Sequence, residues 1–212
     1  MSSPPRETLV TEFGLSSSRQ QRLAPIGIEP IEPDRDPATY AEVYRLARQI
    51  RASDDHVLGF VPADDATPVT PLAVQLTLAL SDATSEKVAL FDANVHGSRL
   101  KGVHQPDDPE LDGFATCWLD DRTAILVSVI ESPIGGRCMP KIEAAIARAR
   151  ARFRWVLVDF SGMETLGEHR RAYDLVEGIV LVARAGKTRD KALVRRQREI
   201  PPERDLGVLL VG

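Results

Sequence analysis

The chain has 212 residues, of which 43% are hydrophobic and 27% charged, and its formal net charge is −4. This length allows one α/β domain with a sizeable core, and the acidic balance gives no support for binding to nucleic acid or to an anionic membrane. No apolar run approaches the roughly 20 residues that span a bilayer, and the first residues lack a signal-peptide core, so we expect a soluble cytoplasmic protein.

The sequence up to residue 37 predicts a flexible N-terminal tail. This segment, 1–37, holds six of the fifteen prolines, a serine run at 16–18 and scattered charge. Such a composition buries too little apolar surface to offset the entropy lost on ordering. A short stretch with Ile26 and Ile28 is the one candidate for docking on the domain as an extended arm.

From Ala38 the pattern changes to alternating helices and buried strands. Apolar spacing predicts helices over residues 38–53, 72–80, 140–153 and 188–198, and a shorter helix over 113–119. Continuous Val/Ile/Leu runs predict buried strands at 57–61, 88–91, 123–130, 155–160, 178–184 and 206–211. The alternation predicts an α/β domain over 38–212, with a doubly wound, mainly parallel sheet flanked by helices. A doubly wound fold with no nucleotide site would fit the same alternation.

Four segments of this region carry motifs in a characteristic order. They are EVYRLAR at 42–48, KVALFDAN at 87–94, RWVLVDFSG at 154–162 and DLVEGIVLVARAGKTR at 174–189. They resemble four motifs of the cytoplasmic bacterial tyrosine kinases of exopolysaccharide synthesis. In the same order, these motifs are a Glu-x-x-Arg-x-x-Arg helix, a strand that ends in Asp-x-Asp, the Walker B strand, and a strand followed by a basic stretch. That family belongs to the deviant Walker ATPases, so the resemblance implies a P-loop NTPase-like fold over nearly all of 38–212.

The stretch GFVPADDATPVTPLAV at 59–74 stands where that family has its phosphate-binding loop. A P-loop needs glycines whose N–H groups close around phosphate, a lysine for the outer phosphates and a Ser or Thr for Mg²⁺. This stretch has no Gly-Lys-Ser/Thr, its prolines lack N–H donors, and its two aspartates would repel a triphosphate. We therefore expect no binding of ATP or Mg²⁺ at this degenerate loop, whose residues include Pro62, Asp64, Asp65, Pro68 and Thr70.

Two acids at strand ends remain as vestigial catalytic candidates. The resemblance assigns Asp92 and Asp159 to the family's magnesium- and water-organising acids. Asn94 stands where the second acid of Asp-x-Asp is usual, which weakens a general-base role. Each acid can equally serve as a hydrogen-bond acceptor that caps the loop after its strand. A metal site shared by these two acids with Asp64 and Asp65 is a further alternative.

Other features of an active kinase are also missing. The resemblance places Val211 where the family commonly has an adenine-contacting Asn, and the family's tyrosine-rich C-terminal tail is absent. Neither the cysteines, Cys117 and Cys138, nor the four histidines show the spacing of a metal site, so we assign no metal ligand. These losses predict a pseudoenzyme.

The helix at 38–53 carries a charged stripe that the sequence retains. Glu42, Arg45 and Arg48 recur every three residues and lie on one side of the helix. In the kinase family this stripe docks on the neighbouring subunit and builds a ring, so the resemblance implies homo- or hetero-oligomers. A solvated face with intrahelical ion pairs fits the same spacing.

The basic stretch at 187–198 is the main charge cluster. Asp190 interrupts it and aromatic residues are lacking, so we expect no sequence-specific binding to nucleic acid, and a solvated helix face is the simpler interpretation.

The combined pattern predicts a catalytically inactive, kinase-like scaffold or regulator in exopolysaccharide or capsule biosynthesis. Its expected partner is the cytoplasmic end of a membrane polysaccharide co-polymerase or export protein, which would hold it at the inner membrane. Two alternatives stay open: an active autokinase or ATPase with a non-standard phosphate loop, and a regulator related to the partition or division-site ATPases.

Overall fold

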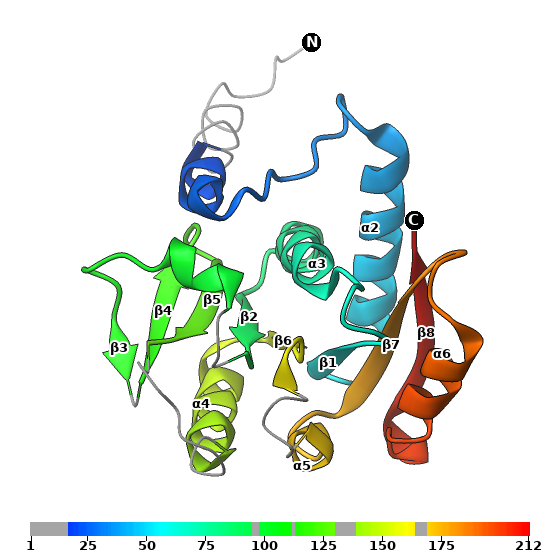
Figure 1. Cartoon of the computed structure of the whole chain (residues 1–212). Helices are drawn as coiled ribbons and strands as arrows, with labels where there is room; N and C mark the ends of the chain where they lie inside the picture. Colours follow the sequence, from blue (N-terminus) through cyan, green and yellow to red (C-terminus); the bar gives the residue numbers. More distant parts are fainter. Residues whose placement is uncertain (1–16, 95–97, 112, 130–138, 164–168) are drawn as a thin grey trace.

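An eight-stranded sheet in the order β3-β4-β5-β2-β6-β1-β7-β8 forms the centre of the computed structural model, which describes residues 17–94, 98–111, 113–129, 139–163 and 169–212 (Figure 1). Its strands are β1 (Val57–Pro62), β2 (Val88–Asp92), β3 (Glu110–Leu111), β4 (Phe114–Trp118), β5 (Thr123–Ser128), β6 (Trp155–Asp159), β7 (Gly178–Arg184) and β8 (Asp205–Val211). The strands from β5 to β8 in this order pair in parallel, whereas β3 and β4 are antiparallel. The predicted α/β domain with a mainly parallel sheet is confirmed.

Helices cover both faces of the sheet. The helices are α2 (Pro37–Ala52), α3 (Val69–Thr84), α4 (Met139–Arg152), α5 (His169–Tyr173) and α6 (Asp190–Gln197), with the short 3-10 turns η1 (Ala24–Ile26), η2 (Arg99–Val103) and η4 (Pro202–Arg204). Two hydrophobic clusters fill the two layers, one under α2 and α3 and the other under α4, α5 and α6. None of the described helices is long and apolar enough to cross a membrane.

Local signals explain where α2 begins. The Asp36 side chain accepts a hydrogen bond from the Thr39 backbone N–H at 3.0 Å, and Pro37 occupies the first turn, where a missing N–H costs least. Val43 and Ala47 then face the core at a four-residue spacing.

The helix predicted at 113–119 is wrong, because the segment forms strand β4. Phe114, Thr116 and Trp118 have β-branched or aromatic side chains, which suit a strand better than a helix. A tight turn then sets β4 against β5: the Asp120 carboxylate accepts hydrogen bonds from the backbone N–H groups of Arg122 and Thr123, both at 2.7 Å. The resulting hairpin adds the antiparallel edge to the sheet.

The structure extends the packed domain N-terminally beyond the tail boundary expected at residue 37. Residues 17–23 are helical, and Leu23 is fully buried. Ile26 and Ile28 pack against the core beneath α2 and α3, so the docking expected of this stretch is confirmed. Residues 1–16 of the expected tail lie outside the described residues.

Ion pairs help to hold residues 17–23 on the domain, and for this reason composition alone predicts a flexible tail here. The Arg19 guanidinium donates to both carboxylate oxygens of Asp82, at 2.8 and 2.9 Å, and also to the buried carboxylate of Asp120. Tyr44 of α2 donates to the same Asp82 carboxylate at 3.0 Å. A charged network therefore supplies part of the attachment that apolar residues usually supply.

Candidate functional site

The two acids predicted at strand ends lie side by side. Asp92 ends β2 and Asp159 ends β6, and the two residues are direct partners in the parallel register. Thr70, in the first turn of α3, donates its hydroxyl hydrogen to Asp159 Oδ2 at 2.5 Å. This group lies at the carboxyl ends of the parallel strands, where open α/β sheets usually bind their ligands.

Both acids are buried, and burial changes their protonation. Asp92 and Asp159 each expose 1% of their surface. Burial, together with the nearby charge of Asp159, raises the pKa of Asp92 to about 7. Burial also raises the pKa of Asp159, although hydrogen bonds from Ser161 and Thr70 oppose the change. Near neutral pH the pair therefore carries less negative charge than two free carboxylates.

Each acid also closes the turn that follows its strand. Asp92 Oδ1 accepts a hydrogen bond from the Asn94 backbone N–H at 2.9 Å. Asp159 Oδ1 accepts one from the Ser161 backbone N–H at 2.8 Å. The prediction that these acids cap their loops is confirmed.

The carboxylate of Asp64 is hydrogen-bonded both by its own loop and by the segment after β7. Its Oδ1 accepts hydrogen bonds from the Ala66 N–H at 3.1 Å and from the Thr67 hydroxyl at 2.9 Å. Its Oδ2 accepts one from the hydroxyl of Thr188, 124 residues away, at 2.8 Å. Partial burial alone would raise the pKa of Asp64, but the hydrogen bonds from Thr188, Thr67 and Ala66 hold the pKa below its ordinary value. The loop thus carries a partly exposed carboxylate that is hydrogen-bonded within the protein.

Most of the loop's backbone N–H groups are already used inside the protein. Besides Ala66, the N–H donors are Ala63 to the Val182 carbonyl at 2.8 Å, Thr67 to the Asp64 carbonyl at 3.0 Å and Val69 to the Thr67 carbonyl at 3.0 Å. Pro62 and Pro68 have no N–H to offer. A phosphate cradle requires free N–H groups that converge on one point, and these residues do not fit it.

The four acids considered as a shared metal site do not come together. Asp64 faces Thr188, Asp65 is exposed, and Asp92 and Asp159 lie at the strand ends. Among the described residues, the group of three metal-ligating side chains that does converge contains none of these acids.

Sequence reasoning missed Thr188, which links the loop to the segment after β7. Its hydroxyl also accepts a hydrogen bond from the Arg184 N–H at 2.9 Å. Thr188 lies in the basic stretch at 187–198, where only the arginines and lysines form a recognisable sequence pattern. That stretch is not all surface either, because Arg196 is buried and its guanidinium pairs with Glu199 at 2.7 Å.

The charged stripe on α2 is accessible in the isolated chain. Arg45 Nη2 lies 2.6 Å from Glu42 Oε1, and both side chains are about half exposed. Arg48 Nε donates to the Tyr44 carbonyl oxygen at 3.4 Å. The structure therefore places the predicted stripe on the surface and joins two of its members in an intrahelical ion pair.

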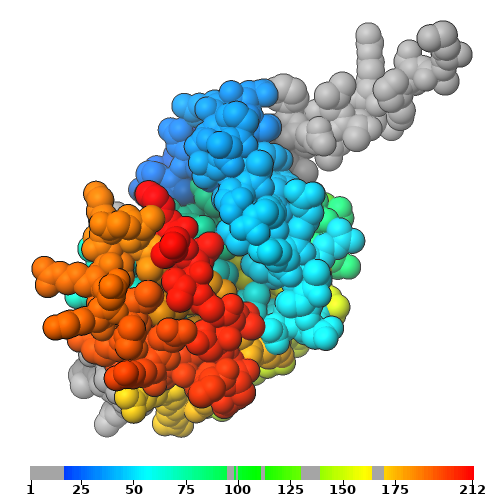
Figure 2. All heavy atoms as spheres, turned by 90° about the vertical axis from the view of Figure 1, so that its right-hand side faces the viewer, coloured from blue at the N-terminus to red at the C-terminus, as the bar shows by residue number. Residues whose placement is uncertain are grey.

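An exposed apolar row lies next to this stripe. Leu206, Val208 and Leu210 on the outer strand β8 expose 51%, 39% and 63% of their surface. A groove with walls from Arg45 and Ile50 of α2 and from Leu206 and Val208 of β8 separates the two elements. Figure 2 shows the red strand β8 beside the light-blue helix α2. We call the stripe and the row together the α2–β8 face.

No protein-family model and no curated protein matches the chain. Among solved structures, the BceF tyrosine kinase domain is similar with a TM-score of 0.62 at 12% identity, over 95% of this chain and 89% of that one. The kinase domain of the Escherichia coli tyrosine kinase ETK gives a TM-score of 0.64 at 15% identity, over 87% and 80% of the two chains.

A ParA family ATPase from Chlorobium tepidum is also similar, with a TM-score of 0.56 at 15% identity over 73% of each chain. At these identities the likeness concerns the fold. The chain therefore has the α/β fold of P-loop ATPase-like proteins, and bacterial tyrosine kinase domains are among its structural neighbours.

Proposed function

We propose that this protein is a catalytically inactive, kinase-like scaffold that organises a membrane complex for polysaccharide chain-length control or export. The observation that carries the proposal is the Asp64 carboxylate, which accepts three hydrogen bonds within the loop where a P-loop would hold phosphate. The polysaccharide setting rests on the four kinase-like segments and on the structural neighbours.

Nucleotide binding would have to dismantle this loop. A triphosphate placed there meets an ionised carboxylate, and like charges repel strongly at short range. The hydrogen bonds from Thr67 and Thr188 would have to break before their donors could serve the ligand. Each lost hydrogen bond to a charged group costs about 1.5–3 kcal/mol, which the new contacts would have to exceed.

The acid pair also suits a structural role better than magnesium binding. Mg²⁺ binds ionised carboxylates and keeps several waters, so it needs an open, charged site. Asp92 and Asp159 are 1% exposed, and the raised pKa of Asp92 keeps part of the pair protonated near neutral pH.

The α2–β8 face supplies the surface that a scaffold needs. It combines the charges of Glu42, Arg45 and Arg48 with the exposed apolar row of β8. Charged stripes give an interface its register, whereas exposed apolar side chains supply most of the burial energy. We expect this face to join copies of the chain or an active paralogue, and the assembly to sit on the cytoplasmic end of the membrane protein.

Calorimetric titration with Mg²⁺-ATP and Mg²⁺-ADP tests the inactive state. We expect no heat of binding up to millimolar nucleotide, and the kinase domain of E. coli ETK serves as the positive control for the assay. Micromolar binding would overturn the proposal.

One observation favours the second candidate, an ATPase or autokinase with a non-standard phosphate loop. The Thr70 hydroxyl is bonded to Asp159, which keeps a hydroxyl beside a strand-end carboxylate. If nucleotide binds and Thr70→Val weakens it at least tenfold, this candidate replaces the first.

A further inference from the structure

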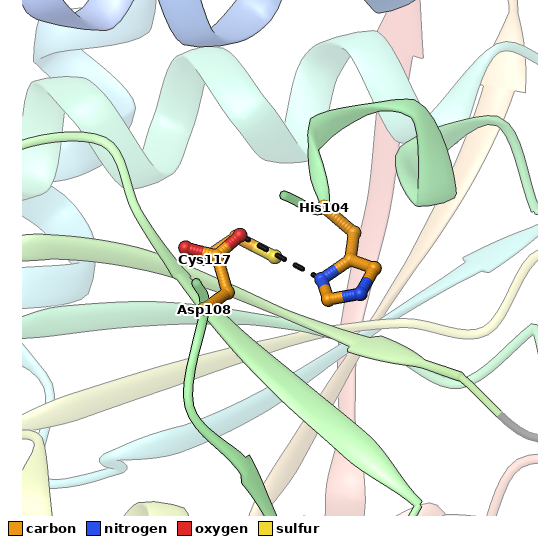
Figure 3. A group of neighbouring side chains, drawn as sticks. All are labelled: His104, Asp108 and Cys117. Atoms are coloured by element: carbon orange, nitrogen blue, oxygen red, sulfur yellow. Dashed lines mark ion pairs between the residues drawn. The ribbon is translucent and has the colours of Figure 1, made fainter. Parts of the chain in front are cut away.

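Beyond the proposed function, a group of metal-ligating side chains lies at the antiparallel edge of the sheet. His104 follows η2, Asp108 lies in the loop before β3, and Cys117 lies in β4 (Figure 3). One ligand atom from each residue lies within 4.8 Å of the others. In the sheet, β4 is separated from β2 by β5, so this group is distinct from the Asp92–Asp159 pair.

The His104 imidazole lies close to the other two side chains without a hydrogen bond from Nδ1 to either of them. His104 Nδ1 lies 3.7 Å from Asp108 Oδ2, which is too long for a hydrogen bond. Nδ1 is buried and has no hydrogen-bond partner among the described residues. In a tetrahedral zinc site with bonds of about 2.0–2.3 Å, neighbouring ligand atoms lie roughly 3.3–3.8 Å apart.

Glu110 prepares the imidazole for this role. Its Oε1 lies 3.3 Å from His104 Nε2. A proton held on Nε2 by this carboxylate leaves the lone pair of Nδ1 directed toward Asp108 and Cys117. The carboxylate–histidine–metal arrangement is the usual second shell of protein zinc sites.

The other two ligands are held in place as well. Asp108 Oδ2 accepts a hydrogen bond from the Gln105 N–H at 2.7 Å, and Arg22 lies 3.2 Å from Asp108 Oδ1. Arg22 Nη1 donates to Asp108 Oδ2 at 3.2 Å, and the Cys117 thiol also donates a hydrogen bond to this carboxylate. Cys117 is fully buried in β4.

Charge also favours a divalent cation. A bound cation stabilises the thiolate and releases the proton to solvent. With a thiolate, the Asp108 and Glu110 carboxylates and the Arg22 guanidinium balance to two negative charges, which match one M²⁺ ion.

We propose that His104, Asp108 and Cys117 bind one Zn²⁺ ion, with a water molecule as the fourth ligand. Thiolate and imidazole select zinc over the oxygen-preferring Mg²⁺ and Ca²⁺. The His104 side chain is 26% exposed, which gives an ion a path to the site. The ion would clamp the loop before β3 onto β4, and through Arg22 it would stabilise the docked N-terminal segment.

The test is a zinc titration of the full chain against a chromophoric chelator, with metal content measured after dialysis. We expect one Zn²⁺ per chain, and we expect loss of binding in C117S and H104A. The matched control is C138S, which removes the other cysteine and should bind zinc as the wild type does. E110Q alters a half-exposed side chain, so it should fold, and it should weaken binding about 10–100-fold.

Cobalt gives a second readout, which reports directly whether a thiolate is among the ligands. Co²⁺ bound at the site should produce a thiolate-to-metal charge-transfer band that C138S keeps and C117S lacks. Absence of zinc binding in the wild type, or equal binding by the wild type and C117S, would overturn the proposal.

Discussion

Two candidate sites in this molecule differ in the side chains that they leave without a hydrogen-bond partner. In the loop at 62–71, Asp64 accepts hydrogen bonds from donors of its own chain, and at the end of β6 Asp159 accepts from Thr70 and from the Ser161 N–H. At the antiparallel edge, His104 Nδ1 faces Asp108 without a hydrogen bond. Asp92 Oδ2, beside Asp159, is likewise buried without a hydrogen-bond partner among the described residues, so this property alone does not mark a binding site. The antiparallel edge differs because its unpartnered imidazole nitrogen lies beside a carboxylate and a thiol, which are ligand types that bind zinc.

The largest expected effect concerns the attachment of the antiparallel edge to the N-terminal segment. Arg19 is nearly buried and serves both Asp82 and Asp120, so Arg19→Ala leaves a buried carboxylate without its cation. We expect a loss of about 3–5 kcal/mol in the free energy of unfolding, measured by urea denaturation. The control is Arg35→Ala, which removes an exposed ion pair with Glu29 and should change stability little. Equal effects of the two changes would mean that the buried Arg19 network contributes no more stability than an exposed ion pair.

The next effect concerns the buried acid pair and depends on pH. The pKa of Asp92 is about 7 in the folded chain and 3.8 for the ordinary carboxyl, so between these values the native state binds more protons than the unfolded state. The contribution of Asp92 to the free energy of unfolding is therefore fully present below about pH 4 and is lost as the pH rises through 7. We expect the wild type to lose on the order of 2–4 kcal/mol across this window, and Asp92→Asn to lose much less. Urea denaturation of the wild type and of Asp92→Asn at pH 5 and pH 8 measures this difference. An equal change in the free energy of unfolding of the two proteins would contradict the prediction.

A smaller effect tests the hydrogen bonds that the Asp64 carboxylate accepts in the loop at 62–71. Asp64→Asn keeps an acceptor but removes its charge, so we expect a loss of about 1 kcal/mol at pH 7. Because the hydrogen bonds lower the pKa of Asp64, the difference should disappear in acid as the wild-type carboxyl is protonated. Asp65→Asn, at the exposed neighbouring position, is the matched control and should leave stability unchanged.

Asp64→Asn also tests whether charge alone keeps phosphate out of the loop at 62–71. If Asp64 excluded nucleotide only by charge, Asp64→Asn would bind Mg²⁺-ATP measurably. We expect it not to bind, because Pro62 and Pro68 still lack N–H donors and Ala63 still donates to Val182.

The parallel sheet could be predicted because its strands are continuous apolar runs, and burial on both faces demands that pattern. The antiparallel edge could not be predicted, because GFATCWL is short and apolar enough to form either a helix or a strand. The turn at Asp120, which lies outside this segment, makes it a strand by setting it against β5. Docking of the stretch with Ile26 and Ile28 could be predicted from its apolar residues, but the packing of residues 17–23 was missed because Arg19 holds this part through charge, which composition counts as polar surface.

The candidate sites divide in the same way. Asp92 and Asp159 could be found because each lies at or near the end of a predicted buried strand, in a segment that resembles a kinase motif. Thr188 and Asp64 meet across 124 residues, and no local pattern reports such a contact. His104 and Cys117 come together because a hairpin folds β4 back beside the loop before β3, so their spacing resembles no linear metal motif.

The smallest effect on stability, and the most informative for function, is expected on the α2–β8 face. Glu42 and Arg45 pair in solvent, so replacing Arg45 and Arg48 by Ala should leave the unfolding of the chain unchanged. If the face joins subunits, the same double variant should reduce the mass measured by light scattering to that of one chain. Leu210→Ser on β8 should do the same through loss of apolar contact, whereas Arg35→Ala, which lies off the face, should not. If the wild type has the mass of one chain even at high concentration, this face would instead bind a different chain. The variant with Arg45 and Arg48 replaced should then fail to capture that partner, whereas the wild type and Arg35→Ala should capture it.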